Sequence, residues 1–326
     1  MLKSCFQTVR AKRCGLLVST LLLVGLPLAS PLSAQTRDRG SWQLYWEPSR
    51  ERVQLTFMDF GRAHGGMTSF GVNPSELQGL TVDQLSAGSS QVRFQLVRDA
   101  GTFNFEGMVK GGHGTGFFTF VPDAHFPQQL QSRGYTRPTA EQQFQLALHD
   151  VGFALVDEIR AQRYPQPTVD DLVTMGMHGA NLEYIRGLSA AGYHVENVDR
   201  LVTLRDHGVS PSFIRGLSRE GYSKLDLNEL LVLRDHGVTP DFIVALRESG
   251  FTNLSAQQLL TARDHGVTPD FARAFRELGY SGLSLRDLIS LRDHGVTVEF
   301  ARRIRSVEGR LTPIQDLIRR RDRGET

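Results

Sequence analysis

The sequence predicts an α+β protein in which a small antiparallel β-domain, a sandwich or an open barrel, precedes an α-solenoid of seven 29-residue helical hairpins. Up to residue 120, apolar and polar residues alternate, which is typical of half-buried strands. After residue 120, one motif returns every 29 residues, which indicates stacked repeats. We expect a β-domain over residues 35–120 and a helical array over residues 121–326, with units that begin near residues 121, 150, 179, 208, 237, 266 and 295.

The first 34 residues have the layout of a secretory signal peptide. The basic segment MLKSCFQTVRAKR precedes the apolar stretch GLLVSTLLLVGLPLAS, and LSA follows before Gln35. The apolar stretch is shorter than the about 20 residues of a spanning helix and contains Pro27 and Pro31. We therefore expect a periplasmic or secreted protein without a membrane span after cleavage. An uncleaved N-terminal membrane anchor is the alternative.

Composition restricts the chemistry of the processed chain. Both cysteines, Cys5 and Cys14, lie in the signal segment, so disulfides, a cysteine nucleophile and cysteine-ligated zinc are excluded. The net charge of +2 gives no indication of nucleic-acid binding. The basic run Arg319–Arg323 is expected to be a solvated helix face.

Five alternating segments predict the β-domain. The turn sequences EPSRE, RDAGT and KGGHGTG separate several of them, and Asn73–Leu80 predicts a short helix with Asn73 as N-cap and Pro74 at its first position. If one face of the sheet stayed uncovered, its two tryptophans could line a ligand groove. The apolar residues of the five segments are Trp42, Leu44 and Trp46; Val53, Leu55 and Phe57; Val92, Phe94 and Leu96; Phe103 and Phe105; Phe118 and Phe120.

Each 29-residue unit predicts two short helices. In the unit after His236, Thr239 is the N-cap and Pro240 the first helical residue, Gly250 ends the first helix, and Ser255 opens the second with a capping box. Helices of about two and a half turns are not stable alone in water, so stacking between units must stabilise them. The repeat is marked by His149, His178, His207, His236, His265 and His294.

The sequence RDHGV ends the second helix of four units and supplies a candidate binding row. Its Asp lies at the negative end of the helix dipole, which costs about 0.3–1 kcal/mol, so a compensating partner is expected. We favour a hydrogen-bond ladder between units, made with the adjacent Arg and His or with amides of a neighbouring helix. Binding of an anion, a sugar or a metal ion is the alternative. The row comprises Arg205, Asp206, His207, Arg234, Asp235, His236, Arg263, Asp264, His265, Arg292, Asp293 and His294.

The sequence predicts no catalytic, cofactor or metal site. Gly111–Gly116 lies between two predicted strands, so this glycine-rich stretch is expected to be a hairpin turn and not a phosphate-binding loop. Neither a His-Glu-x-x-His zinc motif nor a Gly-x-Ser-x-Gly elbow is present. Equivalent atoms of stacked units should lie about 9–10 Å apart, which is too far for ligands that must each lie about 2 Å from one zinc ion.

The units, of the form HGVTPDF…LRE.G…LS…L..LRDHGVTPDF, resemble a tandem repeat of poorly characterised bacterial exported or envelope proteins. The same repeat is also found beside β-lactamase-sensor-type metallopeptidases. The resemblance covers about residues 121–323, and the chain lacks the membrane spans and zinc motif of those peptidases. It therefore implies an exported bacterial repeat protein and transfers no catalytic residue.

Three functions are open at this point. The first is a non-enzymatic scaffold that presents an elongated surface to a protein partner. The second is a sensory or regulatory ectodomain that works with an envelope protease or a signalling protein. The third is a hydrolase with its site between the sheet and the array. Neither a cofactor nor a nucleic acid is expected.

Overall fold

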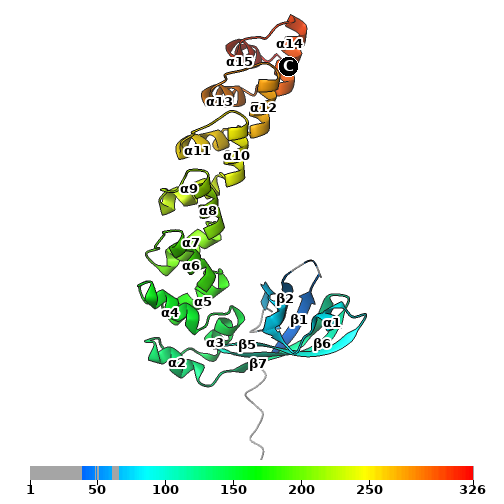
Figure 1. Ribbon diagram of the computed structural model, residues 1–326, viewed down its shortest axis with the longest axis vertical. Coiled ribbons are helices and arrows are strands. Elements are labelled where there is room, and N and C mark those ends of the chain that lie inside the picture. The colour runs from blue at the N-terminus through cyan, green and yellow to red at the C-terminus, as the bar shows by residue number, and fades with distance from the viewer. Residues whose placement is uncertain (1–38, 48, 50, 61–65, 326) are drawn as a thin grey trace, which may run out of the picture. The chain divides into compact units, whose positions relative to one another are not determined.

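The computed structural model describes residues 39–325, except residues 48, 50 and 61–65. The expected signal peptide, residues 1–34, lies outside this part of the chain. In the described part, strands come first and helices follow, so the α+β class is confirmed (Figure 1).

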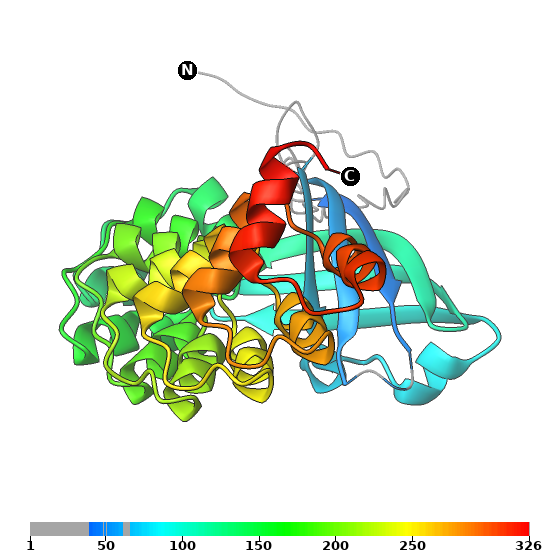
Figure 2. The same ribbon diagram turned by 90° about the horizontal axis from the view of Figure 1, so that it is seen from above.

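The strands form one antiparallel half-barrel sheet in the order β3-β2-β1-β7-β6-β5-β4 (Figure 2). The sequence predicted a sandwich or an open barrel, and the described strands form a single open sheet and not two facing sheets. Strand β7 runs two residues past the expected boundary at residue 120. The strands are β1 (Arg39–Tyr45), β2 (Val53–Phe60), β3 (Gly66–Val72), β4 (Leu77–Gln78), β5 (Ser90–Arg98), β6 (Gly101–Lys110) and β7 (His113–Pro122).

The short helix predicted over Asn73–Leu80 is only one turn long. Asn73 caps it as predicted, but the 3-10 helix η1 spans Pro74–Glu76 alone. The chain then leaves the helix because Leu77 pairs with Leu96 as part of β4. A second helix, α1 (Val82–Ser86), follows, and the sequence analysis missed it although its N-cap forms a capping box.

Aromatic rings fill the interior of the sheet. Trp42 is fully buried and packs edge-on against Phe94, with ring centroids 5.2 Å apart. Its Nε1 donates to the carbonyl oxygens of Glu106 and Phe117, both at 3.2 Å. Gly107 leaves room for the indole, since a Cβ there would lie 2.7 Å from Trp42 Cζ2. Trp42 is thus a core residue, and so is Trp46, which is 8% exposed; neither lines a ligand groove.

Helices occupy the rest of the described chain (Figure 1). Even-numbered helices from α4 to α14 pack on the next even-numbered helix, and α3 with α5, α5 with α7 and α13 with α15 do the same. The helices are α2 (Phe126–Ser132), α3 (Ala140–Leu148), α4 (Phe153–Ala161), α5 (Val169–Met177), α6 (Leu182–Ala190), α7 (Val198–Asp206), α8 (Pro211–Arg219), α9 (Leu227–Asp235), α10 (Pro240–Glu248), α11 (Ala256–Asp264), α12 (Pro269–Glu277), α13 (Leu285–Asp293), α14 (Val298–Glu308) and α15 (Ile314–Asp322).

The predicted helix ends are confirmed in detail. Gly237 has φ of 73°, the left-handed conformation that suits glycine. Its N–H donates to Arg234 O at 3.1 Å, and the Val238 N–H donates to Leu233 O at 2.8 Å. These two bonds define a Schellman ending. RDHGV therefore stops the helix, with His236 as the C-cap.

The sheet contacts the array through residues that depart from the repeat pattern. Phe144 of α3 packs on Phe103 and Phe120, with ring centroids 5.7 and 5.2 Å apart. Helix α4 has Gly152 at its N-cap, and the carboxylate of Asp99, in the β5–β6 turn, accepts from its first N–H at 2.7 Å. A Cβ at Gly152 would lie 2.3 Å from Asp99 Oδ2, so glycine is required there.

Candidate functional site

The Asp and His residues of the candidate row bond to each other across neighbouring units. The Nδ1 of His207 lies 2.7 Å from Asp235 Oδ1, and His236 reaches Asp264 in the same way at 2.5 Å. Because a carboxylate can only accept, the histidine Nδ1 carries the proton. The ladder prediction is confirmed, and the histidine of the preceding unit is the aspartate's partner. The other rungs are His178–Asp206 at 2.8 Å, His265–Asp293 at 2.7 Å and His294–Asp322 at 2.8 Å.

The arginines of the row contact the first helix of their own unit. The guanidinium of Arg205 lies 5.3 Å from the centre of the Tyr184 ring, and its Nε donates to Gly179 O at 3.1 Å. A cation over an aromatic face at this distance is stabilising. The same contact joins Arg234 to Phe213 at 5.3 Å, Arg263 to Phe242 at 5.1 Å, Arg292 to Phe271 at 4.0 Å and Arg321 to Phe300 at 5.6 Å.

The His and Asp residues of the row join neighbouring units, and its arginines join the two helices of one unit, so the twelve residues do not gather around one pocket in the described structure. Each histidine contacts the next unit, each Asp contacts the previous one, and each Arg contacts an aromatic residue of its own unit. The His and Asp side chains of the rungs remain 38–48% exposed. Among the described residues, no group of three or more His, Cys, Asp or Glu side chains is arranged to hold a metal ion.

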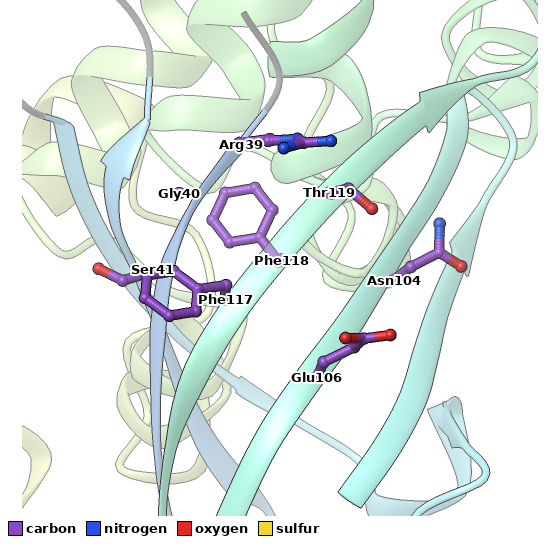
Figure 3. A pocket seen from close by; sticks show the side chains of 8 residues that line it. All are labelled: Arg39, Gly40, Ser41, Asn104, Glu106, Phe117, Phe118 and Thr119. Atoms are coloured by element: carbon purple, nitrogen blue, oxygen red, sulfur yellow. The ribbon is translucent and has the colours of Figure 1, made fainter. Parts of the chain in front are cut away.

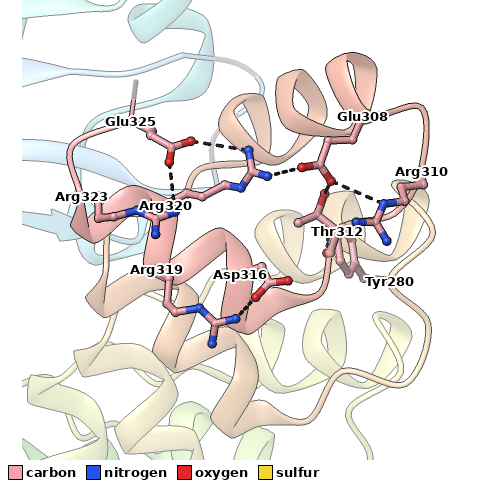
Figure 4. A network of polar contacts seen from close by, with 9 residues as sticks. All are labelled: Tyr280, Glu308, Arg310, Thr312, Asp316, Arg319, Arg320, Arg323 and Glu325. Atoms are coloured by element: carbon pink, nitrogen blue, oxygen red, sulfur yellow. Dashed lines mark hydrogen bonds and ion pairs between the residues drawn. The ribbon is translucent and has the colours of Figure 1, made fainter.

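The ladder begins and ends where the sequence of the units changes. Met177 stands 28 residues after His149, where the later rungs have Asp, and burial lowers the pKa of the His149 imidazole. At the other end Arg323 takes the histidine slot and pairs with Glu325 at 3.3 Å (Figure 4). The arginines of the basic run Arg319–Arg323 have partners within the protein: Arg319 pairs with Asp316, Arg320 with Glu308, and Arg321 Nε donates to Gly295 O at 3.0 Å.

A second set of contacts between units was missed by the sequence analysis. The Tyr222 hydroxyl donates to Leu254 O at 2.5 Å, just before the N-cap of the next unit's second helix. Tyr193 and Tyr280 make the same bond to Leu225 O and Thr312 O, at 2.7 and 2.8 Å. The tyrosine that follows the helix-ending glycine is the sequence signal for this bond. Its acceptor could not be predicted, because the acceptor lies 32 residues further along the chain.

Buried phenols are structural groups. Burial raises the pKa of Tyr184 well above its ordinary value, and its hydroxyl donates to Val209 O at 2.9 Å. Burial also raises the pKa of Tyr135 to about 12. Both phenols are therefore neutral near pH 7, and neither can act as a base there.

A shallow hollow of about 590 Å³ lies on the outer face of the sheet (Figure 3). Strand register places Phe117 between Ser41 of β1 and Glu106 of β6, and the Phe117 side chain is 75% exposed. Glu106 pairs with Arg93 at 3.3 Å. The described residues that line the hollow provide aromatic rings, a carboxylate and other polar groups.

Two adjoining hollows lie between helices α6 and α8. Their volumes are about 690 and 360 Å³, and both are lined by Ala190 and Arg215. Arg186 and Arg205 line the larger hollow, and Arg219 lines the smaller one. We call these two hollows together the α6/α8 groove. Sequence analysis did not single it out.

Comparisons with known proteins give no family. No protein-family model matches the chain, and a search of curated proteins finds no relative. Within residues 39–325, no described helix has the length and apolar character that crossing a membrane requires.

Proposed function

We propose that this chain is an exported, non-enzymatic repeat protein that acts as a scaffold for protein partners. In this proposal the helices α2–α15 are seven hairpins of one α-solenoid, and its surface binds the partner. The sheet covers the first units of the solenoid. A repeat protein of this kind obtains its stability from contacts between neighbouring units, which leaves its long surface free to vary.

The observation that carries the proposal is the use of the RDHG residues. In an enzyme built on this row, Arg, Asp and His would have to meet at one reacting centre. Here the same residues recur at equal intervals: each His and Asp is bonded to a neighbouring unit, and each Arg lies over an aromatic ring of its own unit. Their chemistry is therefore used for packing within and between units. Neither the regulatory ectodomain nor the hydrolase has an observation of comparable weight in its favour.

The test is capture of envelope proteins by the full chain and by a shortened chain. Deleting residues 208–294 removes three periods of 29 residues, so His207 would meet Asp322 as it now meets Asp235. The shortened chain should therefore fold, which its helical circular dichroism would verify. We expect the full chain to capture a defined set of proteins and the shortened chain to lose them. Equal capture by both chains would contradict a scaffold role for the array.

A further inference from the structure

We propose that the α6/α8 groove binds an extended acidic segment of a protein partner, with Arg215 and Arg219 as the main anchors. This inference rests on the proposed scaffold function and names the chemistry of the partner. Both arginines are exposed on α8. Among the described residues, neither guanidinium has an ion-pair or hydrogen-bond partner.

The other two arginines of the groove are fixed in place. Arg186 Nε lies 2.7 Å from Glu158 Oε2, and Arg205 stacks on Tyr184. Arg186 and Arg205 line the groove with side chains that already have partners, while Arg215 and Arg219 remain available to a ligand. The lining contains four arginines and one carboxylate, Glu183, so it attracts anions.

Helix α8 lacks acidic residues that the equivalent helices of the next two units contain. The slot of Arg219 holds Glu248 and Glu277 in the next two units, and the slot of Ser212 holds Asp241 and Asp270. Two arginines of the later helices are also paired with carboxylates. Arg247 pairs with Glu220 at 2.5 Å, and Arg273 pairs with Asp270 at 3.1 Å. Helix α8 has two arginines and no carboxylate between its ends, so its charge is left for an outside partner.

The spacing of the two arginines fits an extended peptide. Residues four apart on a helix are separated by about 6 Å along its axis. Alternate side chains of an extended chain lie on one face, about 6.6–6.8 Å apart. A segment with Asp or Glu at every second position can therefore place one carboxylate on each guanidinium. The hydroxyls of Ser218 and Ser223 line the same groove and can bond to peptide groups.

A short acidic peptide fits these charges better than a nucleic acid. Nucleic-acid binding usually neutralises about six to ten phosphates. The groove offers two unpaired arginines, beside carboxylates at Glu183 and Glu220. Two unpaired guanidinium groups match two carboxylates of a short acidic segment through charge-assisted hydrogen bonds.

The test is fluorescence anisotropy of the full chain with a labelled peptide of five Glu residues that alternate with Ser. A peptide with Gln in place of Glu is the ligand control. We expect binding of the Glu peptide, weakened by added salt. Arg215→Gln and Arg219→Gln should each lower the affinity about fivefold, the upper range for an exposed ion pair.

Arg286→Gln is the matched protein control, because Arg286 is exposed on α13 and lies outside the groove. It removes the same charge and should leave the affinity unchanged. Equal binding of the Gln peptide, or an equal loss in Arg286→Gln, would overturn the proposal. A single-stranded oligonucleotide that binds more tightly with the same arginine dependence would also overturn it.

Capture experiments separate this inference from the proposed function. If the chain with both Arg215→Gln and Arg219→Gln still captures the partners that the chain without residues 208–294 loses, the scaffold function stands and the acidic-segment inference is wrong. Loss of those partners in the double variant, with an unchanged helical circular dichroism spectrum, supports both.

Discussion

The sheet and the helical array are stabilised over different distances along the chain. In the sheet, Trp42 bonds to carbonyl groups 64 and 75 residues away, and rings from five strands share one interior. In the array, the side-chain bonds between units join residues 20–32 positions apart. A destabilising substitution in the sheet should therefore lower the stability of the whole sheet. A destabilising substitution in the array should lower the stability of the substituted unit and of the units next to it.

Trp42→Ala should have the largest effect. It removes a fully buried indole that fits against glycines of β6 and β7. Loss of a buried Trp or Phe costs about 3–5 kcal/mol. We expect the near-ultraviolet circular dichroism of the sheet to be lost at a lower denaturant concentration. An unchanged midpoint would mean that this core does not control the sheet's stability.

Leu246→Ala tests the array in the same way. Leu246 is fully buried in α10, and truncation of a buried Leu costs about 2–5 kcal/mol. We expect faster hydrogen exchange in α8–α13 and unchanged exchange in the sheet. Faster exchange that spreads equally into β1–β7 would remove the difference between the two regions.

Tyr222→Phe should destabilise the array by about 1 kcal/mol, because it removes one partly buried hydrogen bond. The reverse change is available in the next unit, where Phe251 occupies the tyrosine slot. Phe251→Tyr should regain a similar amount through a bond to Leu283 O. Chemical denaturation of both variants checks this pair. Equal effects of the same sign would show that the hydroxyl does not join the units.

Asp264→Ala should have the smallest effect, below about 1 kcal/mol. It removes one exposed His–Asp rung, but it also removes a carboxylate from the unfavourable end of a helix. Met177→Asp is the reverse change, since it would offer His149 a new partner. Thermal unfolding of both variants is the measurement. A loss above 2 kcal/mol for Asp264→Ala would mean that the row has a larger role than stacking.

Much of the array could be predicted because its signals are local. Thr239 caps α10 and Gly237 ends α9, and both roles follow from residues within a few positions. Strand order could not be predicted in this way. Strand β1 lies between β2 and β7, and β7 is distant from β1 in sequence, so local signals do not reveal this pairing. The helix predicted over Asn73–Leu80 was too long because the pairing of Leu77 with Leu96 is equally distant in sequence.

The candidate site could be predicted only in part for the same reason. The position of Asp235 at a helix end showed that it needs a partner, but its bond to His207 depends on how two units stack. The α6/α8 groove was missed because its charge depends on the positions at which α8 lacks the acidic residues of the following units. Ser212 and Arg219 are informative only beside the equivalent residues of the following units.

The central claim is that the Asp and His residues of RDHG join equivalent units, and removal of one whole unit tests it most directly. Deleting residues 237–265 would bring His236 opposite Asp293, the equivalent of its present partner Asp264. Hydrogen exchange of this shortened chain should show a protected sheet and protected helices on both sides of the junction. Loss of protection throughout the remaining helices would show that the array is one indivisible globule and would contradict the account.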